Sequence, residues 1–213
     1  MKLRTEPYLK QLERWPASGR HIMAQFDAET VVVYQAYRPA IGLFAAKNQR
    51  FGGEFSQNRM SWIKPNFLWM MYRSGWGTKE EQETTLAIRL RRAAFDGILE
   101  RAIHSNYVPE VYASPEDWKG RLAESPVRLQ WDPDHDPCGG KQERRAIQLG
   151  LAGNILLQYS QKWIVDIEDI SGFVAEQRGH AESNGFVNLL TPQEEIYPIS
   201  NPDVAQHIGI DRF

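Results

Sequence analysis

The chain has 213 residues and a formal net charge of −2, with 42% hydrophobic and 24% charged residues. These proportions are those of an ordinary globular domain and exclude collagenous, coiled-coil and disordered classes. The single cysteine, Cys138, excludes a disulfide framework and suits a reducing compartment. Residues 1–15 lack the apolar core of a signal peptide, and no apolar run is long enough to span a membrane. We therefore expect a cytoplasmic protein that does not contact membranes.

Charge is divided unevenly along the chain. Residues 1–162 carry 23 Lys and Arg against 18 Asp and Glu, whereas residues 163–213 carry 2 against 9. Two explanations are open. The acidic part packs on the basic part and neutralises it, or the basic part forms a cleft for an anionic ligand.

The first half of the chain alternates strand and helix signals. β-Branched and aromatic residues over 30–37 predict a strand, and Pro39 begins a helix that runs to Asn48. A short strand over 60–63 precedes a helix over 65–73, which is apolar nearly all round. Because such a helix has no face suited to water, we predict that it is buried.

The second half of the chain carries shorter signals. Ser114 and Pro115 mark a helix start, because serine caps a helix and proline fits its first position. We expect further strands over residues 20–26, 86–90, 127–131, 145–149 and 163–170, and further helices over residues 92–104, 154–162 and 171–180. Five to seven short strands in a mixed sheet, with four to six helices, indicate a single compact α+β domain.

The same pattern suggests how the chain is divided. An amphipathic N-terminal arm over residues 1–19 precedes the α+β domain over residues 20–185. A proline-punctuated C-terminal tail over residues 186–213 follows, and we expect it to wrap around the domain. The oligomeric state is left open.

One pattern occurs twice and carries the functional prediction. The segments 37–39 and 63–65 each end a strand, place a cation before a proline, and begin a helix with that proline. Free amides in the first turn of a helix favour an anion, and Arg38 and Lys64 strengthen that preference. We predict that the two turns form one pocket for a phosphate-bearing ligand. The alternative is that the prolines only mark two helix starts and the cations lie in solvent.

Further side chains extend this predicted pocket. Trp62 and Trp76 flank the apolar helix and are candidates for stacking on a nucleotide base, although tryptophans beside such a helix commonly belong to the core. Arg73 either binds the ligand or satisfies the carbonyls at the helix end. The remaining predicted ligand-binding residues supply hydroxyl and amide groups: Tyr37, Ser61, Asn66 and Gln148.

The acidic segment 132–136 resembles a calcium loop in composition. Pro137 occupies the position where that loop needs glycine, and the flanking segments look like strands, so we predict a metal-free surface turn. A site formed by Asp134, His135 and Cys138 is the alternative. The sequence contains no motif of a serine hydrolase, a P-loop NTPase or a Rossmann dehydrogenase.

Five blocks of the sequence resemble the signature blocks of domain-of-unknown-function family 4291, whose members are small bacterial and fungal proteins. The blocks are VYQAYRP (33–39), MSWIKPNFLWMMYRSGW (60–76), SPVRLQWDP (125–133), RAIQLGL (145–151) and WIVDIEDI (163–170). The resemblance covers residues 20–175. It implies membership of that family, and no activity is established for the family.

The order of the first elements is also similar to the front half of ADP-ribosyltransferase-like folds. In those folds the first strand holds the ribose of NAD, and the second strand–helix turn lies under the nicotinamide. The first strand here lacks the His-Gly-Thr or central Arg of that family. The resemblance implies NAD as a cofactor, Gln35, Tyr37 or Arg38 at the ribose, Ser61 with Trp62 under the nicotinamide, and Gln35 and Glu168 as catalytic residues.

The sequence thus predicts an enzyme-like pocket for a nucleotide or another phosphate-bearing ligand. ADP-ribosyltransferase-like group transfer from NAD is the chemistry that the resemblance implies. A non-catalytic module for single-stranded RNA or nucleotides would use the same cations and aromatic rings. An interaction domain without a small-molecule site is the third alternative.

Overall fold

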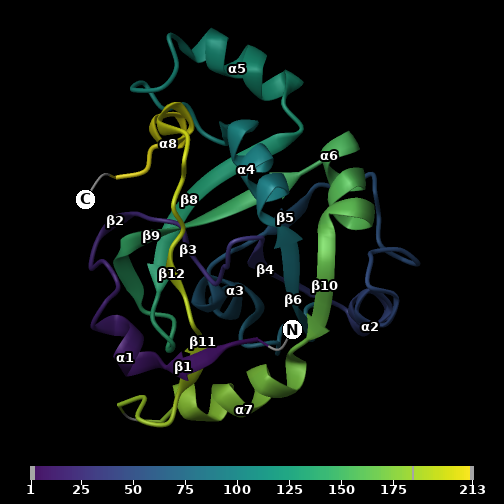
Figure 1. The fold of residues 1–213 in the computed structure, drawn as a ribbon, viewed down its shortest axis with the longest axis vertical. Helices are drawn as coiled ribbons and strands as arrows, with labels where there is room; N and C mark the ends of the chain where they lie inside the picture. The colour runs from purple at the N-terminus through teal and green to yellow at the C-terminus, as the bar shows by residue number, and fades with distance from the viewer. Residues whose placement is uncertain (1–2, 184, 212–213) are drawn as a thin grey trace.

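Two β-sheets joined at one point form the centre of the fold in a computed structural model, which describes residues 3–183 and 185–211 (Figure 1). The first sheet is antiparallel, in the order β10 (Ile164–Asp169), β6 (Thr84–Arg91) and β4 (Thr30–Tyr37). The second has the order β2 (Gly19–Arg20), β9 (Lys141–Leu151), β8 (Val127–His135) and β7 (Ala102–His104), and β5 (Ser61–Ile63) pairs with the end of β9. A bridge between Tyr34 and Lys64 connects β4 to the chain just after β5.

Helices and two small sheets surround this centre. Strand β1 (Thr5–Pro7) pairs with β11 (Leu190–Pro192), and β3 (Met23–Ala24) pairs with β12 (Glu195–Ile196). The helices are α1 (Tyr8–Leu12), α2 (Pro39–Asn48), α3 (Phe67–Ser74), α4 (Arg92–Glu100), α5 (Pro115–Glu124), α6 (Gly153–Gln158), α7 (Ser171–Ala181) and α8 (Pro202–Ile208). The mixture of helices with parallel and antiparallel strands confirms the predicted α+β class.

Strand β4 separates two apolar cores, because alternate side chains of a strand point to opposite faces. Val31 and Val33 belong to one core, whereas Val32 and Tyr34 belong to the other. Helix α3 lies in the second core and packs on β4 and β8. β-Branched residues suit such a strand, which is buried on both sides.

The all-round apolar helix is buried, as its composition predicts. Phe67 is 1% exposed, Trp69 is 6% exposed and Met70 is 2% exposed. The helix begins at Phe67 rather than at Pro65, because the Asn66 side chain accepts the amide of Trp69 and caps the helix.

Other boundaries differ where tertiary contacts outweigh local preference. The helix predicted over 92–104 ends at Glu100, because Ala102–His104 pairs in parallel with β8 as strand β7. The helix predicted over 154–162 consists of α6 followed by a π-helix, Tyr159–Trp163. The pairing of a short strand with a distant one and the widening of a helix into a π-helix leave no periodic signal in the sequence.

The C-terminal segment runs along one face of the molecule from β11 to α8, as the yellow ribbon in Figure 1 shows. It adds a partner strand to β1 and another to β3. The division of the chain into arm, domain and tail stays a prediction. None of the helices within the described residues is both long and apolar enough to cross a membrane.

Candidate functional site

Two adjoining cavities lie where the end of β4 meets the start of β5. The larger has a volume of about 400 Å³ and is called the Lys64 cavity here. The smaller has a volume of about 320 Å³ and is called the Arg38 cavity. The residues that line both cavities are Tyr37, Arg59, Met60, Ser61 and Gln82. The two spaces therefore form one bent cleft.

Lys64 lies in the wall of the larger cavity and is 5% exposed. The bridge to Tyr34 fixes its backbone between the two sheets. Its amine has no hydrogen bond or ion pair with any residue that the structure describes. Burial and, to a smaller extent, the charge of Arg73 lower the pKa of Lys64 to about 8, against an opposing effect of the charge of Asp132.

Two arginines line the Lys64 cavity beside this amine. Arg73 reaches it from the last turn of α3, and Arg59 reaches it from the loop before β5. Both side chains are exposed, and neither has a carboxylate partner within the described part of the chain. Three cations thus line one cavity, and none of them forms an ion pair with an acid among the described residues.

A polar row on the second sheet also lines the Lys64 cavity. Gln130 and Gln148 face each other across β8 and β9 and line the cavity. Gln130 donates to one oxygen of Asp132 at 2.9 Å, and Gln148 donates to the other at 2.7 Å. Both carboxylate oxygens therefore accept from amides and do not pair with Lys64.

Gln35 is the centre of a hydrogen-bond network at the boundary of the two cavities. Its amide nitrogen lies 2.8 Å from both the Tyr37 and the Ser61 hydroxyl, and its carbonyl accepts from Tyr159 at 2.6 Å. The Tyr37 and Ser61 hydroxyls are 2.6 Å apart, so one donates to the other. Among the described residues, the other hydroxyl proton of this pair has no acceptor.

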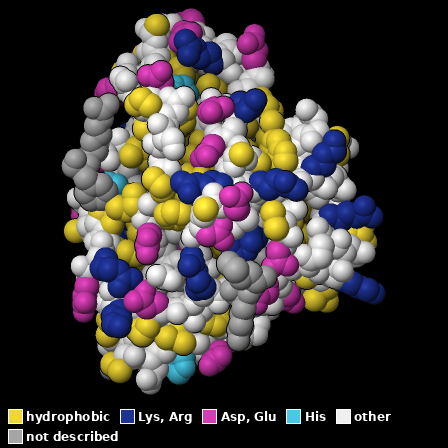
Figure 2. All heavy atoms as spheres, in the orientation of Figure 1, with side chains coloured by type: hydrophobic (Ala, Val, Ile, Leu, Met, Phe, Trp, Pro, Cys, Tyr) yellow, Lys and Arg dark blue, Asp and Glu magenta, His cyan; other side chains and the backbone are white. Residues whose placement is uncertain are grey.

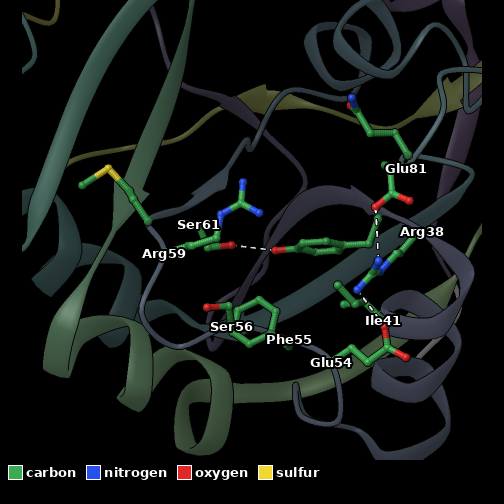
Figure 3. Close-up of a pocket in the computed structure, with 11 residues that line it drawn as sticks. Arg38, Ile41, Glu54, Phe55, Ser56, Arg59, Ser61 and Glu81 are labelled. Carbon is green, nitrogen blue, oxygen red and sulfur yellow. Dashed lines mark hydrogen bonds and ion pairs between the residues drawn. The ribbon is translucent and has the colours of Figure 1, made fainter.

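Arg38 has a different environment in the smaller cavity. Its guanidinium lies 2.7 Å from Glu54 and 3.6 Å from Glu81, and it lies between these two carboxylates in Figure 3. Arg59 and Ser61 lie on the other side of the same view. Arg38 therefore connects two loops at the cleft, and its charge is already balanced by two acids.

Trp62 is half-buried and lines the Lys64 cavity. A Cβ on Gly150 would lie 2.6 Å from the Met60 sulfur and 3.0 Å from the Trp62 ring, so the glycine makes room for both side chains. Trp76 lines neither cavity. Its indole nitrogen donates to the carbonyl of Pro137 at 3.1 Å, and its ring packs on the second core.

Asn66 caps α3 and does not line either cavity. The N-terminus of this helix already has a hydrogen-bond partner within the protein. The Glu194 carboxylate accepts from the Phe67 amide at 2.7 Å and from the Asn66 side chain at 3.2 Å. Burial raises the pKa of Glu194 well above its usual value. The N-terminus of α3 therefore binds an internal acid and presents no free amides to the cleft.

Glu168 lies on β10, two strands away from β4, and lines neither cavity of the cleft. Its carboxylate accepts from the Leu3 amide at 3.3 Å. Of the two predicted catalytic residues, only Gln35 lies at the cleft.

The acidic segment is mostly part of strand β8, which extends to His135 instead of ending at Trp131. Asp134 is fully buried and pairs with Arg144 at 2.6 Å. Asp136 accepts from the amides of Cys138 and Gly140, which closes the turn to β9. No group of three potential metal ligands occurs among the residues that the structure describes.

The fold thus brings together most of the predicted ligand-binding residues: Tyr37, Arg38, Ser61, Trp62, Lys64, Arg73 and Gln148. Two important members of the site were missed. Arg59 stands two positions before Ser61 in the basic stretch, so its proximity to the strand was a usable signal. Asp132 faces the same side as Gln130, but only the pairing of β8 with β9 places it beside Gln148.

The charges on the surface are mixed rather than gathered. Figure 2 shows acidic and basic side chains interspersed on one face of the molecule. A broad basic surface of the kind that holds long nucleic acids by charge is not present on that face. The cations described above instead act within a cleft.

A family model described as a domain of unknown function, DUF4291, matches residues 21–197. This match spans both cavities and the strands that form them. A search of curated proteins gave no match.

Proposed function

Since the chain belongs to the DUF4291 family, whose description gives no activity, we propose from the geometry that it binds a small phosphate-bearing molecule in the Lys64 cavity. One observation carries the proposal. Lys64, Arg59 and Arg73 line the same cavity, and none has a carboxylate partner within the described residues. Cations that line one cavity without forming ion pairs favour an anion, and arginine suits the paired oxygens of a phosphate.

The size of the cleft supports a ligand larger than a single phosphate. Cavities of about 300–1,000 Å³ are typical of small-molecule sites, and the two adjoining spaces have volumes of about 400 and 320 Å³. The half-buried Trp62 offers an aromatic surface beside the cations. A nucleotide, with a phosphate and a flat ring, combines both requirements.

This proposal includes NAD among the ligands but does not include group transfer from NAD. In the resemblance, a glutamate stabilises the ribose, and Glu168 lies outside the cleft. A carboxylate that stabilises a cationic transition state must lie beside the reacting carbon. We therefore propose binding and leave group transfer from NAD to a direct test of NAD turnover.

Calorimetric titration tests the proposal with pyrophosphate, ADP, NAD and a short single-stranded RNA. We expect at least one of the three small ligands to bind, and Arg73→Gln to weaken it about ten- to a hundredfold, because one charge-assisted contact contributes about 1.5–3 kcal/mol. Lys47→Gln is the matched control, since Lys47 is exposed on α2 and lines neither cavity.

Two results would contradict the proposal. The first is the absence of binding by all three small ligands. The second is equal affinity in the wild type and in Arg73→Gln. Binding of the RNA alone would instead favour the nucleic-acid module, because an open groove holds several nucleotides and a closed cavity holds one.

A further inference from the structure

Lys64 differs from the other cations of the cleft, because its amine is both buried and without a partner. Arg38 pairs with Glu54 and Glu81, and Arg59 and Arg73 are exposed. Lys64 is 5% exposed and lines a cavity of about 400 Å³. A buried ammonium normally has a carboxylate beside it, because an unpaired buried charge is costly.

We propose that the Lys64 amine forms an imine with the carbonyl group of an anionic aldehyde or ketone that Arg59 and Arg73 hold in the cavity. This inference rests on the proposed function and names its substrate class. The two arginines are permanently charged and bind the anionic group. Lys64 then acts as a nucleophile instead of a third point charge.

The surroundings of Lys64 increase the fraction of neutral amine, the form that such a reaction needs. Burial and the charge of Arg73 lower its pKa to about 8, against an opposing effect of Asp132. At pH 7 about one amine in ten is then neutral, about 300 times the fraction for a lysine with a pKa of 10.5. Desolvated lysines beside other cations are the type that forms such bonds in enzymes.

Asp132 raises the pKa of this amine but forms no ion pair with it. Its two oxygens accept from Gln130 and Gln148 at 2.9 and 2.7 Å, and no ion pair joins it to Lys64. The charges that act on Lys64 are those of Arg73 from α3 and Asp132 from β8, and Arg59 from the loop before β5 lines the same cavity.

The reaction balances without an oxidant or a reductant. The nitrogen lone pair attacks the carbonyl carbon, a C–N bond forms, and the carbonyl oxygen takes a proton to give a carbinolamine. Loss of that oxygen as water leaves a C=N bond, and the two hydrogens of the water equal the two that the amine has lost. The Lys64 cavity contains the hydroxyl pair of Tyr37 and Ser61, which supplies a hydrogen-bond donor near this chemistry.

Pyridoxal phosphate is a suitable probe, because it carries an aldehyde and a phosphate. The full chain is incubated with one equivalent of the probe, reduced with borohydride, and digested for peptide mass mapping. Borohydride supplies the hydride that converts an imine into a stable amine. We expect the peptide with Lys64 to carry most of the label, with at least tenfold more than the peptide with the exposed Lys47.

Two matched variants sharpen the result. Lys64→Arg keeps a positive charge and loses the primary amine, so it abolishes the label at this peptide. Lys47→Arg leaves the label at Lys64 unchanged. Lys64→Met serves as a second amine-free variant if arginine does not fit, and melting temperatures establish that each variant is folded.

The substrate class is tested with pyridoxal, which lacks the phosphate. We expect pyridoxal to label Lys64 at least tenfold more slowly, and pyrophosphate to protect Lys64 from pyridoxal phosphate. The labelling rate should rise with a midpoint near pH 8 instead of above pH 10.

The outcomes separate this inference from the proposed function. If pyrophosphate binds but Lys64 is labelled no more than Lys47, the imine is overturned and phosphate binding stands. If both aldehydes label Lys64 equally and pyrophosphate does not bind, the anionic substrate class and the proposed function are overturned together. Selective, phosphate-dependent labelling that pyrophosphate blocks supports both.

Discussion

The turn at Arg38 and the turn at Lys64 share one sequence pattern and differ in what surrounds the cation. Each follows a strand and precedes a proline. Arg38 is 40% exposed at its side chain and lies between two acids, whereas Lys64 is buried without a partner. The helix after Arg38 begins directly at Pro39, and the helix after Lys64 is capped by Asn66.

The difference shows which properties such a pattern determines. A strand followed by proline determines the local backbone, because proline fixes φ and ends strand pairing. The surroundings of the cation are determined by other segments of the chain. Glu54 and Glu81 come from nearby loops, whereas β8 and α3 bury Lys64 on the other side of the cleft.

The largest expected effect concerns the helix after Lys64. Glu194→Ala removes the acceptor for the Phe67 amide and the Asn66 side chain, and both donors are buried. Each buried donor left without a partner costs about 1–3 kcal/mol, so we expect the loss of two to lower the free energy of unfolding by about 2–6 kcal/mol. Urea denaturation at pH 7 measures it. Glu195→Ala is the matched control, because the neighbouring side chain is exposed.

Glu194→Gln keeps a hydrogen-bond acceptor and cannot ionise, so it separates the contribution of the hydrogen bonds to stability from that of the charge. Burial raises the pKa of Glu194 well above 4.5, so the folded protein holds a proton that the unfolded chain releases. The wild type must therefore lose stability relative to Glu194→Gln as the pH rises from about 4.5 to 7. A constant difference over that range would show that the carboxylate is ionised in the fold.

The second effect has the opposite sign. Lys64→Met removes a buried amine that has no partner, and a pKa lowered to about 8 means that the ammonium opposes folding at pH 7. We expect the variant to gain about 1–3 kcal/mol of unfolding free energy at pH 7. Urea denaturation of both proteins measures the difference.

The pH dependence of this gain follows from the direction of the shift. Between pH 8 and 10.5 the unfolded chain keeps a proton on Lys64 that the folded protein has lost, so the wild type becomes more stable with rising pH. The advantage of Lys64→Met should shrink over that range. Lys47→Met should change stability by less than about 0.5 kcal/mol at either pH, since that lysine is exposed. A loss of stability in Lys64→Met would show that the amine has a partner.

The sequence predicted the parts of the site that depend on neighbouring residues. The β-branched run of β4 and the apolar surface of α3 were sufficient to place both, and the cation before each proline marked the cleft. Asn66 was assigned to the ligand although it caps the helix, because the acid that binds beside it, Glu194, lies 128 residues further along the chain. No local pattern contains that information.

Gln35 shows the same limit within the site. Its position in an apolar strand indicated that the amide needs partners, and the alternatives were a ligand and the backbone. The partners are mainly side chains, the Tyr37 and Ser61 hydroxyls and a tyrosine that lies 124 residues away in the π-helix. A helix of that kind has no sequence signature, so this contact is visible only in the fold.

The smallest expected effect concerns the turn at Arg38, and it sharpens the comparison most. The ion pair of Arg38 with Glu54 is 2.7 Å long, but the side chains are 40% and 58% exposed. Exposed pairs contribute about 0.2–1 kcal/mol, and salt screens them. We expect Arg38→Gln to lower the free energy of unfolding by less than about 1 kcal/mol, and the loss to fade in 1 M salt. Urea denaturation in low and high salt measures both.

A double-mutant cycle separates the ion pair from the packing of the two loops. Arg38→Gln, Glu54→Gln and the double variant should give a coupling of about 0.2–1 kcal/mol in low salt and almost none in 1 M salt. The effect of Lys64→Met should be nearly the same at both salt concentrations, because Lys64 is buried. A loss above about 2 kcal/mol for Arg38→Gln, unchanged by salt, would contradict this contrast. Arg38 would then hold the two loops together. The two turns would differ in the exposure of their cations, but both cations would affect the free energy of unfolding strongly.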